Sequence, residues 1–304
     1  MIIDVHTHYP DQKYILKSDY ATELLLKSRA REGVDKRLLT PQKVMPIDVD
    51  TFIDEWHTAG IDKMVILAWP LMDRIWGCRV PDSVVADIAN KYPDIVIGFA
   101  GVEAVDTHDR LNKKGLDDFV KSIKDLGLKG LKFTPIYSHY RPDDKRNYLV
   151  FEKCVELDIP IMIHSSAGHT QKNTPFSYAN PLLLDDAFED FPDLRVCIAH
   201  LGDPWVGEVY NLIVKNDNVY TDVSANCMRP MWLAWNLVVA KEYRVLDKVL
   251  FGSDGPGVCR PVSKFIEYFK TGLNQIAKNA GWPTFTAEEI NGILGKNAKK
   301  WLKL

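Results

Sequence analysis

The sequence predicts an α/β fold, a single-domain (β/α)8 TIM barrel over residues 1–304, with a cap segment inserted after the first strand. Short apolar runs rich in β-branched residues recur eight times along the 304 residues, and helical patterns separate them. Strands that alternate with helices and are apolar on both faces indicate a parallel sheet covered by helices. The length fits one such barrel of roughly 250 residues with insertions.

The eight predicted strands follow one another with room for a helix between most of them. They span residues 1–6, 63–69, 95–102, 128–133, 159–164, 195–200, 218–224 and 248–254. Eight units in one chain favour a closed barrel over an open, doubly wound sheet. An open dinucleotide-binding sheet would need a glycine-rich turn after its first strand, where this chain has His6-Thr7-His8.

Helical periodicity is clear in several of the intervening segments. Residues 116–127 place four apolar side chains on one face, and Gly127 is the predicted C-cap. Residues 147–158 and 181–192 show similar patterns, and the second of them stops at Pro192. The four residues of the first apolar face are Leu116, Phe119, Ile123 and Leu126.

Residues 9–49 depart from this alternation, because they separate the first strand from the next helical pattern. The loops that follow barrel strands lie at the C-terminal mouth of the barrel, where active sites are built. We therefore predict that this segment is a lid over the site.

The composition is that of an ordinary globular protein, with 46% hydrophobic and 26% charged residues. A net charge of −3 argues against a nucleic-acid-binding protein, which would carry a basic face. No apolar stretch approaches the ~18 residues of a membrane span. The N-terminus lacks the basic region of a signal peptide. We expect a cytoplasmic protein with a small-molecule substrate, and self-association as a homo-oligomer is left open.

The five cysteines lie far apart and form no CxxC pair. In a cytoplasmic chain of this length they are expected to be reduced thiols. Cys154, Cys197 and Cys227 lie in or beside apolar segments, and we expect them to be small buried hydrophobes. Cys259 lies in a loop rich in glycine and proline and receives no assignment, and Cys78 is the fifth.

Polar side chains at the strand ends are the candidates for chemistry, because the C-terminal ends of barrel strands converge on one site. His6 and His8 are two residues apart on a strand, so both imidazoles point to the same side and can bind one metal. With His164 and Asp254 they supply three nitrogens and one oxygen, which suit Zn²⁺ or another borderline divalent ion. Taken singly, each residue also has an ordinary structural explanation. The strand-end residues in chain order are His6, His8, Trp69, Glu103, Lys132, His164, His200, Asp222, Ser224 and Asp254.

These strand-end motifs resemble those of the amidohydrolase superfamily. The chain has DVHTH at its start, then GLKF followed by Pro135, IHSSAGH, AHLGDP and FGSD. The set is most similar to the amidohydrolase-2 branch, which includes aminocarboxymuconate-semialdehyde decarboxylase, dihydroxybenzoate decarboxylases and several lactonases. The resemblance runs from Ile2 to Asp254. It implies a (β/α)8 barrel with a divalent metal, most often zinc and sometimes manganese.

The resemblance also implies roles for individual residues. His6, His8, His164 and Asp254 match the metal ligands, and Asp254 matches the group that takes and returns the proton of the attacking water. His200 matches a histidine that polarises the substrate or acts as an acid or base. We expect one metal ion per chain.

Lys132 leaves a second possibility open. Binuclear members of the superfamily carry a carboxylated lysine at this position that bridges two metals, and the second metal would use His164 and His200. Otherwise Lys132 is a plain lysine that binds a substrate carboxylate or faces solvent. Its alternation with Leu131 and Phe133 allows it to face the barrel interior.

Several residues that follow strand ends are predicted to bind the substrate. An arginine there could hold a substrate carboxylate with two hydrogen bonds, although a surface ion pair is the more common role. Single histidines and aromatic residues in such loops also often have no functional role. The candidates are Trp69, Tyr137, His139, Trp205 and Arg229.

The predicted function is a hydrolase that directs a metal-activated water at a small carboxylate-bearing ester, lactone or amide. The alternative is a metal-dependent non-oxidative decarboxylase or hydratase of an aromatic or unsaturated acid. Asp203-Pro204-Trp205 after His200 depart from the pattern of the decarboxylases, which favours hydrolysis. A third reading, a catalytically inert barrel that binds metal or ligand, is disfavoured because the set of metal and acid–base residues is complete.

Overall fold

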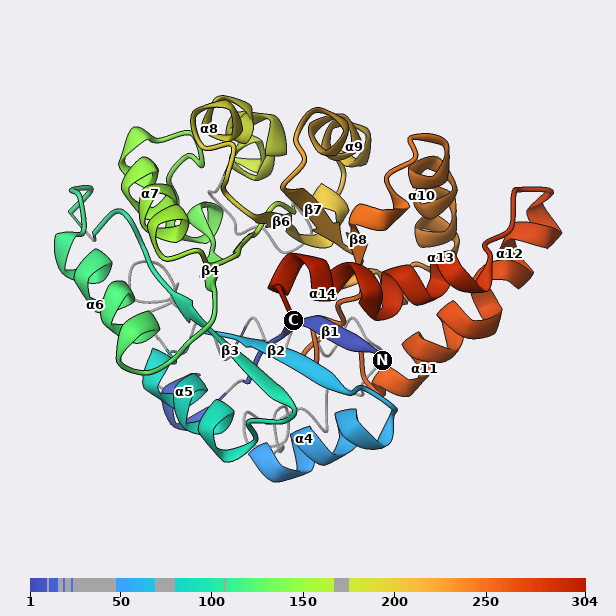
Figure 1. Ribbon diagram of the computed structural model, residues 1–304, viewed down its shortest axis with the longest axis horizontal. Coiled ribbons are helices and arrows are strands. Elements are labelled where there is room, and N and C mark those ends of the chain that lie inside the picture. The colour runs from blue at the N-terminus through green and yellow to red at the C-terminus, as the bar shows by residue number, and fades with distance from the viewer. Residues whose placement is uncertain are drawn as a thin grey trace.

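The computed structural model describes residues 1–9, 11–15, 19, 23, 48–68, 80–106, 108–166 and 175–304. Eight parallel strands pair in the order β1 to β8, each with the next strand along the chain. Helices alternate with the strands and surround them on the outside (Figure 1). The predicted (β/α)8 barrel is confirmed.

Each strand lies inside one of the eight runs that the sequence predicts, except that β1 ends one residue beyond its run. Each strand is shorter than the predicted run. They are β1 Ile3–Thr7, β2 Lys63–Leu67, β3 Val96–Gly101, β4 Leu131–Phe133, β5 Ile161–Ile163, β6 Val196–Ile198, β7 Val219–Asp222 and β8 Val249–Leu250. The runs continue beyond most strands into the loops at the C-terminal mouth, and these loops carry the polar residues.

Backbone hydrogen bonds between β1 and the segment after β8 close the barrel. The N–H of Asp254 donates to the carbonyl of His6 at 2.7 Å, and the N–H of His8 donates to the carbonyl of Gly255 at 2.9 Å. These bonds place Asp254 beside the two histidines of β1. Closure of the barrel and assembly of the candidate site therefore use the same contacts.

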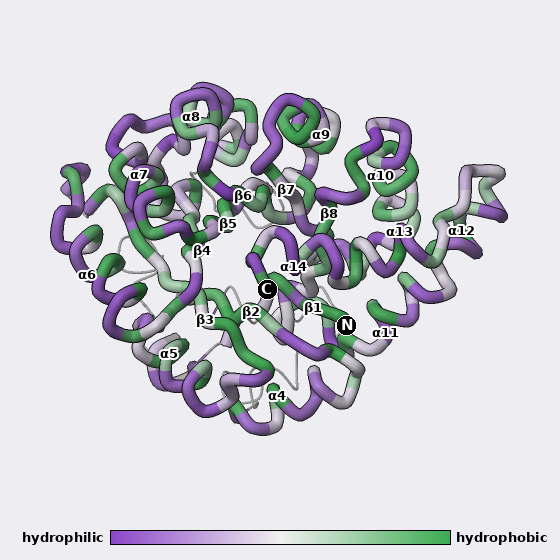
Figure 2. The backbone as a smooth tube through the Cα atoms, viewed as in Figure 1, coloured by the Kyte–Doolittle hydropathy of each residue, from purple (hydrophilic) through white to green (hydrophobic). Residues whose placement is uncertain are grey.

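The helices on the outside of the barrel follow the strands in turn, and four of them come after β8. They are α4 Val49–Thr58, α5 Asp82–Lys91, α6 Lys113–Lys124, α7 Tyr148–Glu156, α8 Asp185–Asp190, α9 Val206–Lys215, α10 Pro230–Glu242, α11 Val262–Glu267, α12 Leu273–Ala280, α13 Ala287–Asn291 and α14 Asn297–Leu302. Figure 2 shows hydrophobic residues along β3, while α5 and α6 alternate between hydrophilic and hydrophobic residues.

Helix α6 differs from its prediction at the C-terminal end. It begins after Asn112, whose side chain accepts the N–H of Gly115, and its C-cap is Asp125. Leu126, predicted on the buried face, is 39% exposed because the helix ends before it. Gly127 is not the C-cap and lies in the following turn with a φ of +73°, a left-handed conformation that glycine adopts without strain.

Helix α14 closes the end of the barrel where the strands begin, and it crosses that end in Figure 1. Trp301 is fully buried there, and its ring lies 5.7 Å from the ring of Phe99, centroid to centroid. Arg195, just before β6, donates a hydrogen bond from Nη1 to the carbonyl of Trp301 at 2.6 Å. Trp301 and Ala298 belong to one apolar cluster with strand residues of the barrel interior.

Among the described residues, no helix combines the length and the apolarity that crossing a bilayer requires. The most apolar helix, α10, packs Leu233 and Leu237 into the core and leaves Met231 and Trp235 58% and 49% exposed. Self-association of the chain stays a prediction.

The predicted lid, residues 9–49, lies mostly outside the described residues. The described part comprises Tyr9, the short helix α1 Gln12–Ile15, isolated positions and the start of α4. The ring of Tyr9 stacks on that of Phe52 in α4, with the centroids 6.3 Å apart. The role of this segment as a lid stays a prediction.

The prediction that all cysteines are reduced thiols is wrong for two of them. Cys227, in the loop after β7, forms a disulfide with Cys259, in the loop after β8, and their Cα atoms are 6.0 Å apart. Adjacent strands bring together two loops that are 32 residues apart, so the sequence spacing carried no signal. Cys154 and Cys197 are buried free thiols as predicted, and Cys78 lies outside the described residues. Disulfides are rare in cytoplasmic proteins, so this bond does not support the expected cytoplasmic location.

Candidate metal centre

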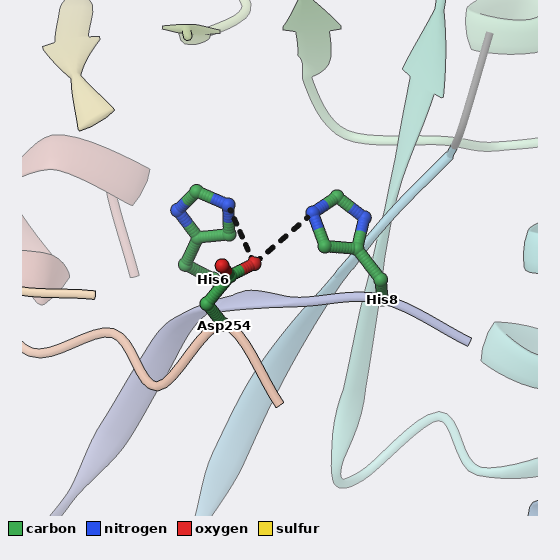
Figure 3. A group of neighbouring side chains, drawn as sticks. All are labelled: His6, His8 and Asp254. Atoms are coloured by element: carbon green, nitrogen blue, oxygen red, sulfur yellow. Dashed lines mark ion pairs between the residues drawn. The ribbon is translucent and has the colours of Figure 1, made fainter. Parts of the chain in front are cut away.

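Three of the four predicted metal ligands meet at the C-terminal mouth of the barrel. Oδ1 of Asp254 lies 3.6 Å from Nε2 of His6 and 3.6 Å from Nε2 of His8. The ligand atoms of the three residues all lie within 4.8 Å of one another. Figure 3 shows both imidazole rings turned toward the same carboxylate oxygen.

The backbone around Asp254 holds the carboxylate in this position. Asp254 has a φ of 60°, a left-handed conformation that is uncommon outside glycine but tolerated by aspartate. Glycine is needed just before it, because a Cβ added at Gly252 would lie 2.8 Å from Cβ of His6. The glycine therefore allows the chain after β8 to approach β1 closely.

The hydrogen bonds of His6 and His8 orient both Nε2 atoms toward the site. Nδ1 of His6 lies 2.9 Å from Oδ2 of Asp222, and Nδ1 of His8 lies 3.3 Å from the carbonyl of Leu67. Both partners accept hydrogen bonds, so each ring carries its proton on Nδ1 and a lone pair on Nε2. Metal-binding histidines commonly donate their other N–H to a carboxylate or a carbonyl in this way. The donor set therefore fits a divalent ion.

The electrostatics of the site agree with this fit. Burial lowers the pKa of His6 well below its usual value and that of His8 to about 3, so both rings are neutral, as ligands must be. Burial raises the pKa of the Asp254 carboxyl. A bound cation would oppose that shift and favour the carboxylate.

His164 and His200 lie next to each other in the same cluster. Nδ1 of His164 is 3.2 Å from Nε2 of His200, and the ring of His200 lies 4.8 Å from that of His6, centroid to centroid. Nε2 of His164 lies 3.3 Å from the carbonyl of Ser166. His164, the fourth predicted ligand, is thus connected to His6 through His200.

Lys132 faces the barrel interior, as its alternation on β4 predicts. It is 2% exposed, and Nζ lies 3.0 Å from Nε2 of His6, the atom that faces Asp254. Burial lowers the pKa of Lys132. The alternative of a solvent-facing lysine is therefore wrong, whereas a carbamate bridge and a contact to substrate both stay predictions.

Tyr137 and Arg229, two of the predicted substrate-binding residues, have different surroundings. The buried ring of Tyr137 lies 4.4 Å from the ring of His164, centroid to centroid. Arg229 binds a carboxylate of this chain, with Nη1 donating to Oδ2 of Asp203 at 2.8 Å. Its guanidinium also lies 4.6 Å from the ring centroid of Trp232.

The other three substrate candidates lie in loops or outside the described residues. His139 has a φ of 55° at the end of a short 3-10 helix after β4. Trp205 is half-buried and is the N-cap residue of α9. Trp69 lies outside the described residues.

Sequence reasoning placed Asp222 and Ser224 at a strand end but gave them no role. Both are fully buried. Besides holding His6, Asp222 accepts at Oδ1 the backbone N–H groups of Ser224 and His200, at 2.8 and 3.2 Å. The sequence did contain a signal for Asp222, which is a charged residue near the end of a predicted strand. A carboxylate that is buried there must be paired.

The chain is similar to one protein family and to several solved structures. The family model described as Amidohydrolase matches residues 3–304. An uncharacterized TIM-barrel protein from Bordetella bronchiseptica has a TM-score of 0.75 at 21% identity, with 99% of this chain and 98% of that chain covered. A dihydroxybenzoic acid decarboxylase from a Polaromonas species, solved with bound manganese and an inhibitor, has a TM-score of 0.68 at 15% identity, with 100% and 97% covered.

A third solved structure has a different reaction in its name. It is a probable 2-pyrone-4,6-dicarboxylic acid hydrolase from Acinetobacter baumannii with citric acid bound. Its TM-score is 0.66 at 17% identity, with 100% of this chain and 99% of that chain covered. At these identities the likeness to solved structures establishes the shared fold.

Proposed function

This chain belongs to the amidohydrolase family, and from that premise we propose that it is a metal-dependent hydrolase of a small carboxylate-bearing ester, lactone or amide. The observation that carries the proposal is the convergence of Nε2 of His6, Nε2 of His8 and Oδ1 of Asp254 within 4.8 Å. Two neutral imidazoles and a carboxylate that face one another, with the other imidazole nitrogens already bonded, suit a catalytic metal.

His6, His8 and Asp254 hold the ion in this proposal, and His164 is the fourth ligand. Nitrogen donors with one carboxylate favour Zn²⁺, with Mn²⁺ as the alternative, and one ion per chain is proposed. When bound, the ion supplies Lewis acidity, which lowers the pKa of a water molecule and polarises a carbonyl oxygen.

The protein's own groups carry the proton transfers. Asp254 accepts a proton from the attacking water and returns it to the leaving atom. Its carboxylate is placed for both transfers, because Oδ1 lies 3.6 Å from Nε2 of His6 and from Nε2 of His8, the atoms that would hold the ion. His200, whose ring lies next to those of His6 and His164, is the second acid–base group.

The substrate's carboxylate is proposed to contact Lys132. Of the two cationic candidates, Arg229 is bonded to Asp203, whereas Nζ of Lys132 lies at the metal-ligand atom of His6. Tyr137 packs against His164 and forms part of the proposed substrate site. Trp69, His139 and Trp205 stay predicted contacts.

The second candidate is decarboxylation or hydration of an aromatic or unsaturated acid. The likeness of this chain to a decarboxylase solved with manganese supports it. The same metal site would serve, but the reaction would deliver a proton to carbon instead of removing protons from water. This difference makes the two candidates separable by experiment.

The test is a paired assay on the full chain after metal analysis. The chain is stripped with a chelator, reloaded with zinc or manganese, and offered esters, lactones and amides of small carboxylic acids, with hydroxybenzoates as the matched decarboxylase panel. We expect acid release that follows metal loading. Release of carbon dioxide without hydrolysis would establish decarboxylation. Inactivity with both metals on both panels would contradict hydrolysis and decarboxylation and leave hydration or ligand binding.

A further inference from the structure

We infer that Asp4 and Trp56 are positioning residues that hold His6 and Asp254 at the spacing a shared metal ion needs. The inference rests on the metal centre of the proposed function but not on which reaction occurs there. Its evidence is a break in the regular pairing of β1 with both of its neighbours.

Strand β1 contains one extra residue relative to β2. Asp4 pairs with Met64 and Thr7 pairs with Ile66, so three steps along β1 correspond to two steps along β2. An extra residue of this kind is a β-bulge, which interrupts the ladder and often lies next to active sites. The bulge falls in the stretch that contains His6, a proposed metal ligand.

The pairing of β1 with the segment after β8 shifts at the same place. The N–H of Val5 donates to the carbonyl of Phe251 at 3.0 Å, and a regular parallel ladder would next bond the N–H of Ser253 to the carbonyl of Val5. Instead, the next backbone bond runs from the N–H of Asp254 to the carbonyl of His6. The shift leaves the N–H of Ser253 without a backbone partner among the described residues.

One oxygen of Asp4 accepts the N–H groups on both sides of this seam. Oδ1 accepts the N–H of His6 at 3.1 Å and the N–H of Ser253 at 3.0 Å. Ser253 precedes Asp254 directly, so a single atom ties the backbones of two proposed ligands together. The side chain of Asp4 is fully buried, where an N–H group without a partner would cost free energy.

Trp56, on α4, holds Asp4 from the other side. Its Nε1 donates to Oδ2 of Asp4 at 2.9 Å, so both oxygens of this side chain are held. Trp56 is fully buried, and a Cβ added at Gly255 would collide with Cζ2 of its ring. Gly255 follows Asp254 directly, so the indole also lies against the backbone that carries this ligand. We call Asp4 and Trp56 together the brace.

Core packing is the competing explanation, because the ring of Trp56 also lies 4.6 Å from that of Phe52, centroid to centroid. Packing does not explain Asp4, since a buried polar side chain costs free energy unless it is hydrogen-bonded. It also does not explain why the N–H groups that Asp4 accepts are those of the bulge and of the shifted register. A brace between two ligand-bearing segments accounts for both observations.

The spacing that the brace controls is a narrow one for a metal ion. Bonds from zinc to nitrogen or oxygen are about 2 Å long, so two atoms can share an ion only while they stay within roughly 4 Å of each other. Oδ1 of Asp254 and Nε2 of His6 lie 3.6 Å apart. A small slip of one segment along the other would therefore separate the two ligand atoms.

The first test compares two fully buried tryptophans. Trp56→Phe removes the N–H that holds Asp4, whereas Trp301→Phe makes the same change where Nε1 has no hydrogen-bond partner among the described residues. Both variants should unfold at a lower temperature. Zinc affinity of the full chain, measured by competition with a chelator, should fall about tenfold in Trp56→Phe and stay unchanged in Trp301→Phe. Equal zinc affinities of the two variants would overturn the inference.

Asp4→Asn tests the contacts at the seam without changing the shape of the side chain. An amide has one acceptor oxygen, so its NH₂ group must face either the two backbone N–H groups or the N–H of Trp56. Zinc affinity should fall about 10–100-fold. The matched control is Asp82→Asn, because Asp82 is also buried and accepts a backbone N–H, that of Gly101, at 3.2 Å. A loss of equal size in Asp82→Asn would overturn the specific role of Asp4.

The double variant Asp4→Asn, Trp56→Phe tests whether the two residues act together. Phenylalanine has no N–H, so the amide can turn its oxygen to both backbone N–H groups without opposing a donor. Zinc binding in the double variant should therefore be no weaker than in Asp4→Asn alone. Losses that add would indicate two independent effects and would contradict a shared brace.

Cobalt provides a signature that a change in overall stability does not produce. The visible absorption of Co²⁺ depends on the number and geometry of its ligands. At saturating Co²⁺, Trp56→Phe and Asp4→Asn should give spectra that differ from the wild-type spectrum, and Trp301→Phe should reproduce it. A wild-type spectrum in both brace variants would show that the ligand geometry does not depend on the brace.

The brace and the reaction fail separately. If the wild type binds zinc but hydrolyses no ester, lactone or amide, and the brace variants lose zinc affinity as expected, the brace stands and the proposed reaction fails. If hydrolysis is observed and both brace variants bind zinc as tightly as the wild type, the proposed function stands and the brace is refuted.

Discussion

The two ends of the barrel are built from opposite kinds of side chain. At the C-terminal mouth the buried residues include His6 with its two partners Lys132 and Asp222. At the other end, Trp301 of α14 is buried against Phe99. Apolar burial supplies most of the stability of a folded domain, and buried charges tend to cost free energy unless they are paired. The end where the strands begin is thus apolar, and the buried polar side chains of the candidate site lie where the strands end.

The backbone shows the same division. Left-handed residues occur at both ends, but Arg244 and Lys303 adopt this conformation where the chain leaves a helix. His200 and Asp254 adopt it in the segments that follow β6 and β8, and their side chains belong to the candidate site. Such conformations cost on the order of 1–3 kcal/mol each and persist only where the surroundings enforce them.

The largest expected effect comes from the loss of the histidine pair. In a His6→Asn, His8→Asn double variant, metal content should fall to background and turnover should fall by roughly 10³ or more, since Lewis acidity contributes several kcal/mol. Elemental analysis measures the metal content, an activity assay measures the turnover, and circular dichroism checks that the variant is folded. A folded variant that retains one metal per chain would move the metal centre away from these residues.

His200→Asn tests the same end of the barrel without removing a proposed ligand. Turnover should fall by about 10²–10⁴, the usual contribution of a positioned acid–base group, and metal content should stay at about one per chain. A fall from about two ions to one, in both His200→Asn and Lys132→Ala, would instead establish the binuclear alternative.

Trp301→Ala tests the apolar end. The loss of a fully buried indole should reduce the free energy of unfolding by about 3–5 kcal/mol, while metal content and kcat of the folded protein stay unchanged. Urea denaturation measures the first and elemental analysis the second. Trp235→Ala is the matched control, because that indole is 49% exposed and should contribute less. Loss of metal together with stability would show that the two ends are coupled.

The disulfide gives the smallest expected effect of the four. It joins the loops that carry Ser224 and Asp254, so it lies at the C-terminal mouth of the barrel, beside the candidate site. Replacing Cys227 and Cys259 with serine should reduce the free energy of unfolding by about 2–4 kcal/mol. The wild-type chain under a reducing agent should show the same change, and the double variant should then be insensitive to that agent. Equal stability of all forms would indicate that the bond does not form in solution.

The fold could be predicted from the sequence because local pattern determines it. Apolar, β-branched runs form strands because one face packs against the helices and the other fills the barrel interior, and the eight runs match the eight strands. Local pattern predicts the ends of helices less well. Leu126, for example, is exposed because α6 ends at Lys124. The end of a helix depends on capping and on packing against the rest of the protein, which spacing alone does not encode.

The candidate site, too, could be predicted only in part. His6, His8 and Asp254 could be found because strand ends are predictable positions in a barrel. The partnership of Asp222 with His6 joins residues 216 positions apart, and no local pattern reports which strand end faces which ring. The disulfide and the Arg229–Asp203 pair were missed for the same reason, since both join different loops of the mouth.

The bonds that close the barrel have a consequence for the order of events during synthesis. His6 and His8 leave the ribosome first, but the backbone and carboxylate contacts that complete their site come from Asp254, near the end of the chain. At translation rates of about 5–20 residues per second, roughly 10–50 s separate the two. An ion therefore cannot guide the early steps of folding, and incomplete chains that lack the last strand carry no finished site. In the proposed metal centre, binding by all of these residues therefore requires a chain that extends at least to Asp254.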